Sequence, residues 1–369
     1  MPNIAMILEN ADGERRCAMT PEVCRKLTAK GVHVVIQGGS GLNAGFNDSD
    51  YAEAVIKSQA TDVLAMADVL LVVQPPVAET LRLLKAGAVI IGLLAPHKCL
   101  DRMPVYLEKR HSAFSLEKLP RTTRAQAMDV LSSQAGMAGY KAVLIAAQLA
   151  PRFFPMLTTA AGTIRPSKVL IIGAGVAGLQ AIATAKRLGA QVEGFDVRPE
   201  TREQIESLGG KFLDLGVSAV GEGGYARPLT DEERSLQQER LAQHLKGIDV
   251  VVCTAAVPGR PAPKIITEGM VSGMRRGSVI VDLAAESGGN CAMTEPGVDR
   301  DCNGVLVSGP LNLASLGAIH ASEMYARNLF NFLSLMIAED GQLTLPFDDE
   351  LVAKTCIAHD GVEPAQGAT

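Results

Sequence analysis

Tryptophan is absent from this chain of 369 residues, and aromatic side chains make up only 4% of it. The sequence therefore offers no aromatic surface on which nucleic-acid bases would stack. Positive charge is not in excess either, because 35 Lys and Arg stand against 40 Asp and Glu, for a net charge of -5. Binding of nucleic-acid phosphates needs clustered basic residues. We therefore expect no nucleic-acid partner.

The sequence has no C-x-x-C pair, and its cysteines are odd in number and widely spaced. They are Cys17, Cys24, Cys99, Cys253, Cys291, Cys302 and Cys356. The histidines are equally dispersed, with no pair at the i, i+4 spacing that a metal site on a helix needs. This pattern predicts reduced thiols in a cytosolic protein, with neither a disulfide framework nor a metal site.

Long apolar runs are missing as well. The longest, Ala88 to Pro96, is far shorter than the roughly 20 residues that a membrane-spanning helix requires. The N-terminal segment has no basic stretch followed by a long apolar one, so we expect no signal peptide. The sequence predicts a chain with no direct membrane span.

A chain of this length usually folds as two domains. Up to about residue 120, short apolar runs alternate with amphipathic ones, which is typical of strands and helices around a parallel sheet. One helix is predicted from its start, because Thr20 is a suitable N-cap and Pro21 suits the first helical position. Residues 126–150 predict a long helix that ends before Pro151 and links two domains.

A second alternating series starts at Lys168. Its predicted strands lie near residues 168–172, 191–195, 211–213, 249–253, 278–282 and 304–307. Six strands fit a complete doubly wound sheet. A Gly-rich polar stretch at 216–230 predicts a surface loop, and residues 314–338 predict a long helix that returns the chain to the first domain.

These patterns predict an α/β protein of two Rossmann-like, doubly wound parallel-sheet domains joined by long helices. The first domain is expected to be discontinuous, with residues 1–130 and 312–369, and the second to comprise residues 131–311. Ligands of open α/β sheets bind at the carboxyl ends of the strands, so the cleft between the domains is the expected cofactor site.

The segment from Val169 to Asp196 combines an apolar strand, a glycine turn, a helix, a second strand and a terminal carboxylate. In this order, G-x-G-x-x-G predicts dinucleotide binding. Gly173 would permit the tight turn, Gly175 would let a pyrophosphate approach the backbone, and Gly178 would let the helix press onto the sheet. The N–H groups at the start of the helix would then face phosphate.

The carboxylate of Asp196 would accept hydrogen bonds from an adenosine ribose and repel a 2′-phosphate, which favours NAD(H) over NADP(H). Arg198 weakens this preference, because an arginine beside this position can pair with the extra phosphate. Two alternatives stay open. The glycine turn could serve packing only, or the site could hold S-adenosylmethionine, whose sites carry a similar acidic residue.

Several further segments point to one superfamily. They are GERRCAMTP near the start, RTTRAQAMDVLSSQAGMAGYKAV at 121–143, GGYAR at 223–227, PGRPAPKIIT at 258–267, VDLAAESGGNC at 281–291 and NLFNFL at 328–333. Over nearly its whole length the chain closely resembles the NAD(H)-binding component, domain I, of proton-translocating NAD(P) transhydrogenase. It resembles alanine dehydrogenase, which shares that architecture, more distantly.

In that family a loop holds the nicotinamide end of NAD(H) through an arginine, a glutamine and an aspartate. The resemblance assigns these roles to Arg121, Gln126 and Asp129, with Ser132 adding a hydroxyl. Such groups can hold the carboxamide and its ribose and so fix which ring face is presented. From the residues alone, capping and ion pairing at the start of the long helix explain Arg121, Asp129 and Ser132 equally well.

The resemblance also implies further contacts with the cofactor. They involve Asp196, Val197 and Arg198 at the adenosine, Val176 at the pyrophosphate, and Gly224, Gln237 and Ala256 elsewhere. Tyr225 lies in the loop that closes over bound nucleotide in the family, and the neighbouring glycines suit a hinge. Without the resemblance, the same stretch is an exposed Gly-rich loop with no role.

Four amino-acid-handling positions bear on the choice between the two relatives, and three of them have changed. Arg16 lies where the substrate-binding arginine of alanine dehydrogenases would lie, but their lysine and histidine correspond to Val73 and Leu93, and their aspartate to Glu286. The changes disfavour an amino-acid substrate, whose chemistry also needs a proton donor. Arg16 and Glu286 would then serve structure or inter-domain contact, and whether they pair is left open. An alanine-dehydrogenase-like enzyme stays the alternative, and a non-catalytic NAD(H) sensor is a third interpretation.

Direct transfer between two nicotinamides requires two dinucleotide sites, and this sequence contains one convincing fingerprint. We therefore expect the NADP(H) site on a partner, the NADP(H)-binding transhydrogenase domain or beta subunit. The family's membrane segments would belong to a separate integral membrane subunit that couples the reaction to proton translocation. The resemblance further implies a homodimer in the cytoplasm, peripheral on the cytoplasmic face of the inner membrane.

Overall fold

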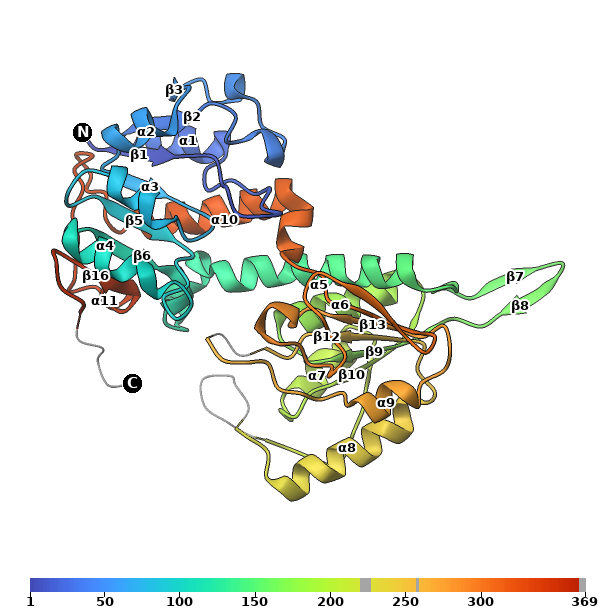
Figure 1. Ribbon diagram of the computed structural model, residues 1–369. Helices are drawn as coiled ribbons and strands as arrows, with labels where there is room; N and C mark the ends of the chain where they lie inside the picture. Colours follow the sequence, from blue (N-terminus) through green and yellow to red (C-terminus); the bar gives the residue numbers. More distant parts are fainter. Residues whose placement is uncertain (220–226, 257–258, 365–369) are drawn as a thin grey trace. The chain divides into compact units, whose positions relative to one another are not determined.

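The computed structural model describes residues 1–219, 227–256 and 259–364. The chain divides into two compact units (Figure 1), which we call the first and the second unit. The first is formed by residues 1–134 and 315–369, and the second by residues 135–314. The predicted boundaries, after residues 130 and 311, lie a few residues before these.

The first unit is built on a seven-stranded sheet in the order β16-β6-β5-β4-β1-β2-β3. The strands are β1 (Asn3–Met6), β2 (His33–Gln37), β3 (Val55–Lys57), β4 (Val69–Leu71), β5 (Val89–Gly92), β6 (Ser112–Ser115) and β16 (Cys356–Ala358). All neighbours run parallel except β16, which is antiparallel to β6. The helices are α1 (Pro21–Ala29), α2 (Ala60–Met66), α3 (Ala78–Leu83), α4 (Met103–Glu108), α10 (Ala318–Leu333) and α11 (Glu350–Thr355).

Successive residues at strand β1 pack into two different layers of core. Ile4 and Met6 lie in one layer with residues of α1 and α10, whereas Ala5 and Ile7 lie in the other with residues of α2, α3 and α4. Side chains alternate along a strand, so both faces of a central parallel strand must be covered by helices. The predicted doubly wound arrangement is confirmed in this unit.

Helix α1 begins where its sequence signals place it. The Thr20 hydroxyl accepts a hydrogen bond from the Val23 amide at 3.5 Å, and Pro21 occupies the first helical position. Val23, Cys24 and Leu27 form the buried face of the helix. Cap chemistry and burial therefore agree on the same helix.

The second unit contains another seven-stranded sheet, in the order β11-β10-β9-β12-β13-β15-β14. The strands are β9 (Lys168–Ile172), β10 (Gln191–Phe195), β11 (Lys211–Phe212), β12 (Val250–Cys253), β13 (Val279–Asp282), β14 (Asp299–Cys302) and β15 (Val305–Ser308). The helices are α6 (Val176–Arg187), α7 (Thr201–Ser207), α8 (Asp231–Leu245) and α9 (Glu268–Ser272). The six predicted strands have the Rossmann order 3-2-1-4-5-6. Strand β14 was not predicted, because it is polar, largely exposed and antiparallel at the edge.

The long helix α5 (Val130–Leu149) runs from the first unit into the second. It starts later than the predicted residue 126, because Thr123–Met128 forms a 3-10 helix, η5, and Asp129 caps the α-helix. Beyond α5 lies a hairpin that the sequence did not predict, formed by β7 (Leu157–Thr159) and β8 (Gly162–Ile164). Figure 1 shows the hairpin extending away from the sheet of its unit, and every residue of both strands is exposed.

The predicted helix at 314–338 is α10, which is shorter than expected because residues Leu313–Gly317 form a 3-10 turn, η7. Its side chains Leu329, Phe332 and Leu333 are fully buried in the core of the first unit. No helix among the residues that the structure describes is both long enough and apolar enough to cross a membrane.

His111 is a buried base in the first unit. Its side chain has no exposed surface, and its Nε2 lies 3.1 Å from the Lys85 carbonyl oxygen. Burial lowers the pKa of His111 to about 4, because a charged imidazolium is poorly solvated there. The unfolded chain takes up this proton near the ordinary value of 6.5, so the folded state loses stability as the pH falls from 6.5 toward 4.

We predict that the His111→Gln variant loses roughly 2 kcal/mol less stability than the wild type when the pH falls from about 7 to about 4.5. Glutamine can still donate to the Lys85 carbonyl but does not titrate. Urea denaturation at both pH values measures the difference, with His33→Gln at an exposed position as the control. Equal losses in the wild type and His111→Gln would contradict the prediction.

Candidate functional site

The glycine turn follows strand β9 and opens helix α6. Gly173 has a left-handed backbone, with φ +96°, and a Cβ there would lie 2.7 Å from the Thr254 hydroxyl. A Cβ at Gly178 would lie only 1.8 Å from the carbonyl oxygen of Gly173, whereas a Cβ at Gly175 would meet nothing within 4 Å. The first and third glycines therefore serve the turn and the helix packing, and the second leaves open space at the N-terminus of α6.

Asp196 follows strand β10 and fastens it to this turn. Its buried carboxylate accepts a hydrogen bond from the Ala174 amide at 2.7 Å and pairs with the Arg198 guanidinium, with an Nη2 to Oδ2 distance of 2.8 Å. Burial acts to raise the pKa of Asp196, but the hydrogen bonds from Arg198 and Ala174 outweigh it and hold the pKa below its ordinary value. Asp196 is therefore a carboxylate at neutral pH.

Two residues that the sequence motifs did not indicate hold the loop after β12 in place. The Thr254 hydroxyl donates to the Gly173 carbonyl at 3.0 Å. The side chain of Asn290 is fully buried, and its Oδ1 accepts a hydrogen bond from the backbone N–H of Ala255 at 3.1 Å. Its Nδ2 donates to the carbonyl oxygens of Ala255 and Pro263 at 2.7 and 2.9 Å. Asn290 lies inside the VDLAAESGGNC segment, but nothing in its spacing indicated these partners.

The remaining expected cofactor residues of the described chain also lie in the second unit. Val176 is the first residue of α6 and is 46% exposed, Val197 is half-buried, and Ala256 is exposed. Gln237 lies on α8, where its Oε1 is buried and has no hydrogen-bond partner among the described residues. The other two expected residues, Gly224 and Tyr225, lie outside the described residues.

The predicted nicotinamide loop lies in the first unit. Arg121 and Gln126 are exposed, and Asp129 is half-buried. The Asp129 carboxylate accepts hydrogen bonds from the Ser132 amide at 2.9 Å and from the Ser132 hydroxyl at 2.5 Å. The structure thus shows the capping arrangement for Asp129 and Ser132 that the sequence left open, on a loop where Arg121 and Gln126 face solvent.

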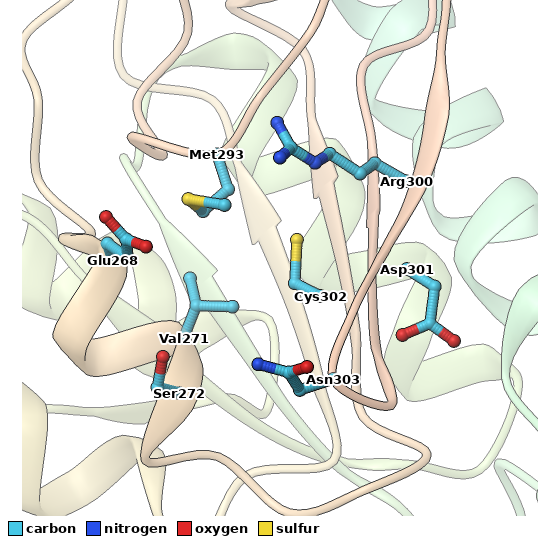
Figure 2. Close-up of a pocket in the computed structure, with 8 residues that line it drawn as sticks. All are labelled: Glu268, Val271, Ser272, Met293, Arg300, Asp301, Cys302 and Asn303. Atoms are coloured by element: carbon cyan, nitrogen blue, oxygen red, sulfur yellow. The ribbon is translucent and has the colours of Figure 1, made fainter.

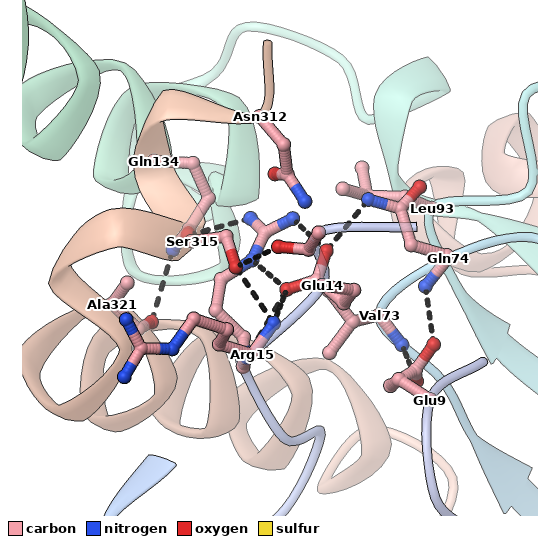
Figure 3. A network of polar contacts seen from close by, with 12 residues as sticks. Glu9, Glu14, Arg15, Val73, Gln74, Leu93, Gln134, Asn312, Ser315 and Ala321 are labelled. Atoms are coloured by element: carbon pink, nitrogen blue, oxygen red, sulfur yellow. Dashed lines mark hydrogen bonds and ion pairs between the residues drawn. The ribbon is translucent and has the colours of Figure 1, made fainter. Parts of the chain in front are cut away.

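Figure 3 shows a network of polar contacts around the buried Glu14 of the same unit. The Arg16 guanidinium bonds both oxygens of Glu14, with Nε to Oε1 at 2.8 Å and Nη2 to Oε2 at 2.6 Å. Burial acts to raise the pKa of Glu14, but the hydrogen bond from Arg16 outweighs it and lowers the pKa to about 2. Gln74 donates to Glu14 at 2.8 Å. In the second unit, the Glu286 carboxylate accepts a hydrogen bond from the backbone N–H of Asn312 at 2.7 Å.

A cavity of about 230 Å³ lies elsewhere in the second unit, at strand β14 and helix α9 (Figure 2). Glu268, Arg300 and Asp301 line it together with Cys302. None of the expected cofactor residues lines this cavity, and it lies at the β14 edge whereas the glycine turn follows the central strand β9. It is therefore not part of the candidate site.

Two family models match nearly the whole chain: alanine dehydrogenase/PNT, N-terminal domain, at residues 5–138, and alanine dehydrogenase/PNT, C-terminal domain, at residues 142–363. The chain belongs to this family. It is 44% identical to the first part of NAD(P) transhydrogenase subunit alpha of Rhodospirillum rubrum, over 99% of this chain and 100% of that protein. It is 42% identical to the first part of the same subunit of Rickettsia prowazekii, over 97% and 95% of the two chains.

Solved structures agree with this assignment. A crystal structure of transhydrogenase from Sinorhizobium meliloti matches with a TM-score of 0.88 and 41% identity, covering 98% of this chain and 99% of that one. A structure of L-alanine dehydrogenase matches with a TM-score of 0.82, covering 98% and 96%, and at 23% identity it shows the shared fold alone. The resemblance inferred from the sequence motifs is confirmed.

We predict that Gly178→Ala lowers the free energy of unfolding by roughly 2–4 kcal/mol, because its methyl group would overlap the Gly173 carbonyl. Gly175→Ala is the matched control. It should cost less than about 1 kcal/mol, because its methyl group would enter open space. Chemical denaturation measures the free energy of unfolding of both variants. A Gly178→Ala variant as stable as the wild type would show that the helix does not need this close approach.

Proposed function

We propose that this chain is the NAD(H)-binding subunit of a proton-translocating transhydrogenase. It positions NADH for direct hydride transfer to NADP⁺ bound on a partner subunit, and membrane subunits couple that transfer to proton translocation. The observation that carries the proposal is the complete glycine turn beside Asp196, in a chain that matches transhydrogenase alpha subunits along nearly its whole length. The family itself supports NAD(H) binding.

The geometry of the second unit fits a dinucleotide. The open space at Gly175 lets a pyrophosphate approach the backbone, and the first amides of α6 can bond its oxygens. The ionised carboxylate of Asp196 suits a ribose diol and disfavours a 2′-phosphate. The buried Oε1 of Gln237, which has no partner among the described residues, is an acceptor that a ligand donor could satisfy. These features support NAD(H) as the cofactor of this chain.

The loop of the first unit supplies the groups that orient the reacting end. In this proposal Arg121 and Gln126 bond the carboxamide side, and Asp129 with Ser132 bonds the neighbouring ribose. Bound NADH supplies the hydride, and the protein supplies orientation and exclusion of water. Asp129 keeps lone pairs for a ligand while it caps α5, because a carboxylate can accept about four hydrogen bonds.

The strand ends of the first unit support our placing the NADP(H) site on a partner. Glu9 accepts hydrogen bonds from two backbone amides after β4, at 2.6 and 3.1 Å. Glu117 accepts from two amides after β5, at 3.1 and 2.6 Å. Ligands of open α/β sheets bind at the carboxyl ends of the strands, but here carboxylates of the chain itself bond these backbone amides. We therefore assign NADP(H) to the NADP(H)-binding domain or beta subunit, beside an integral membrane subunit.

A homodimer belongs to the same proposal, and the β7–β8 hairpin is the surface that supports it. A two-stranded hairpin is marginally stable in water by itself. Leu157 and Ile164 on its strands are 36% and 47% exposed, and Met156 beside it is 64% exposed. Burial of these apolar side chains against a second copy would stabilise the hairpin. The assembly is expected on the cytoplasmic face of the inner membrane.

An alanine-dehydrogenase-like activity is the second candidate, and the shared fold is what favours it. The first unit disfavours it. The Arg16 guanidinium is bonded by Glu14 and Gln134, and apolar Val73 and Leu93 stand where alanine dehydrogenases have a lysine and a histidine. A non-catalytic NAD(H) sensor remains the third candidate, which would not need the ring-orienting residues of the loop.

We predict that NADH oxidation by an NADP⁺ analogue occurs only when a purified transhydrogenase NADP(H)-binding component is added. The partner is needed because the sequence contains one convincing dinucleotide-binding fingerprint. Absorbance of the reduced analogue measures the reaction, and pyruvate with ammonium serves as the second acceptor. Turnover with pyruvate and ammonium alone would make the chain a dehydrogenase. Binding of NADH without turnover in either assay would make it a sensor.

We predict that Asp196→Ala weakens NADH affinity about tenfold or more, because the ribose loses its acceptor. Asp129→Asn, which preserves shape and a capping oxygen, should slow hydride transfer far more than it weakens binding. Fluorescence titration and single-turnover rates measure the two effects, with Asp214→Ala at an exposed position as control. Unchanged affinity would remove Asp196 from the ribose site, and equal losses would contradict a positioning role for Asp129.

A further inference from the structure

Two asparagines of helix α10 bond the same carbonyl group of the predicted nicotinamide loop. The side-chain amides of Asn328 and Asn331 donate to the Ala127 carbonyl oxygen at 2.8 and 2.9 Å. Ala127 directly follows Gln126 and lies two residues before Asp129. These are the two asparagines of the NLFNFL segment, to which the proposed function assigns no role.

Asn328 also bonds the start of α5, which determines how its amide is oriented. Its Oδ1 accepts from the Ser133 hydroxyl at 2.8 Å while its Nδ2 donates to Ala127. The Ser133 amide in turn donates to the Asp129 carbonyl at 3.2 Å. Asn328 is 8% exposed, and a buried amide is costly unless both of its ends are bonded. The side chain therefore holds the loop and the first turn of α5 in one arrangement.

The bonds continue from this asparagine into the network of polar contacts in Figure 3. Gln134 donates to the Ser133 hydroxyl and to the Ala321 carbonyl, both at 3.1 Å, and accepts from Arg16 at 2.9 Å. A connected polar network in a low-dielectric interior favours one geometry, because each broken bond leaves a buried group unpaired. All of these residues belong to the first unit.

Two buried residues anchor this loop to the core of the first unit. Ala125 and Met128 of η5 are buried in the core of the first unit, while Gln126 is exposed. Between these two anchors, the Ala127 carbonyl is the group that α10 holds. Rotation of this peptide would turn Gln126 and shift Asp129, because the intervening backbone is short.

We propose that Asn328 and Asn331 are positioning residues for hydride transfer. By holding the Ala127 carbonyl they set the direction in which Gln126 and Asp129 are presented, without contacting the cofactor themselves. This inference rests on the proposed function, in which those two side chains orient the nicotinamide. Because the second unit provides the turn and Asp196 for the rest of the dinucleotide, loss of the asparagines should affect the rate more than the affinity.

The test compares Asn331→Ala, Asn331→Gln and Asn328→Ala with the wild type. Arg327→Gln, on the same helix, is the matched control, because Arg327 pairs with Glu22 and not with the loop. Three quantities are measured: amide hydrogen exchange of residues 121–134 without cofactor, the dissociation constant of NADH, and the single-turnover rate with the NADP(H)-binding component.

We expect both alanine variants to exchange about three- to tenfold faster in residues 121–134 and to transfer hydride about 10- to 100-fold more slowly. Their NADH dissociation constants should change by less than about threefold. Asn331→Gln retains a donor and should recover some of the rate. Should Asn328→Ala fail to fold, Asn331→Ala still decides, because Asn331 is only half-buried and its side-chain amide bonds the Ala127 carbonyl directly.

The proposal would be overturned if the alanine variants kept the wild-type rates of hydride transfer and of amide hydrogen exchange. Equal losses of hydride-transfer rate and NADH affinity would also overturn it. Faster exchange without a rate effect would limit the asparagines to a structural role and also overturn it. If the wild type itself transfers no hydride, the proposed function fails, and this result is distinguishable because the exchange measurement needs neither cofactor nor partner.

Discussion

The close approach of helix α6 to strand β9 is the constraint on which the rest of the site depends. The helix lies against the Gly173 carbonyl at Gly178, and α5 lies against the Ala177 carbonyl at Gly139 in the same way, so that neither glycine has room for a side chain. These are contacts with backbone, which no side-chain rotation can relieve. They bring the first amides of α6 to the carboxyl edge of the sheet, beside Asp196.

Carboxylates bind backbone amides at strand ends in both units. Asp282 accepts from the Cys291 amide at 2.9 Å after β13, and Glu9 accepts from two amides after β4. For two glutamates of the first unit, the pKa depends on a neighbouring cation. Burial raises the pKa of Glu9 to about 7, whereas at Glu14 the hydrogen bond from Arg16 overcomes burial and lowers the pKa to about 2. Both units thus bond carboxylates to backbone amides at the ends of strands, but the second unit leaves the N-terminus of α6 open to a ligand.

Local chemistry explains which elements of the fold could be predicted. Strands β9 and β10 have their predicted bounds, because apolar runs between turn residues indicate buried parallel strands. The β7–β8 hairpin and β14 were missed, since exposed residues carry no apolar periodicity. The start of α5 was placed too early, because the helix propensity of residues 123–128 suits a 3-10 turn as well as an α-helix.

The sequence by itself determined the family, the doubly wound fold and the glycine turn beside Asp196, because these depend on residues that are neighbours along the chain or on whole motifs. Only the tertiary structure decided that Asn328 holds the Ala127 carbonyl across 201 residues, and that Arg16 reaches Gln134 across 118. It also decided that the Gln237 oxygen is buried without a partner among the described residues. Such contacts depend on how distant helices pack, and no local periodicity or cap signal encodes that packing.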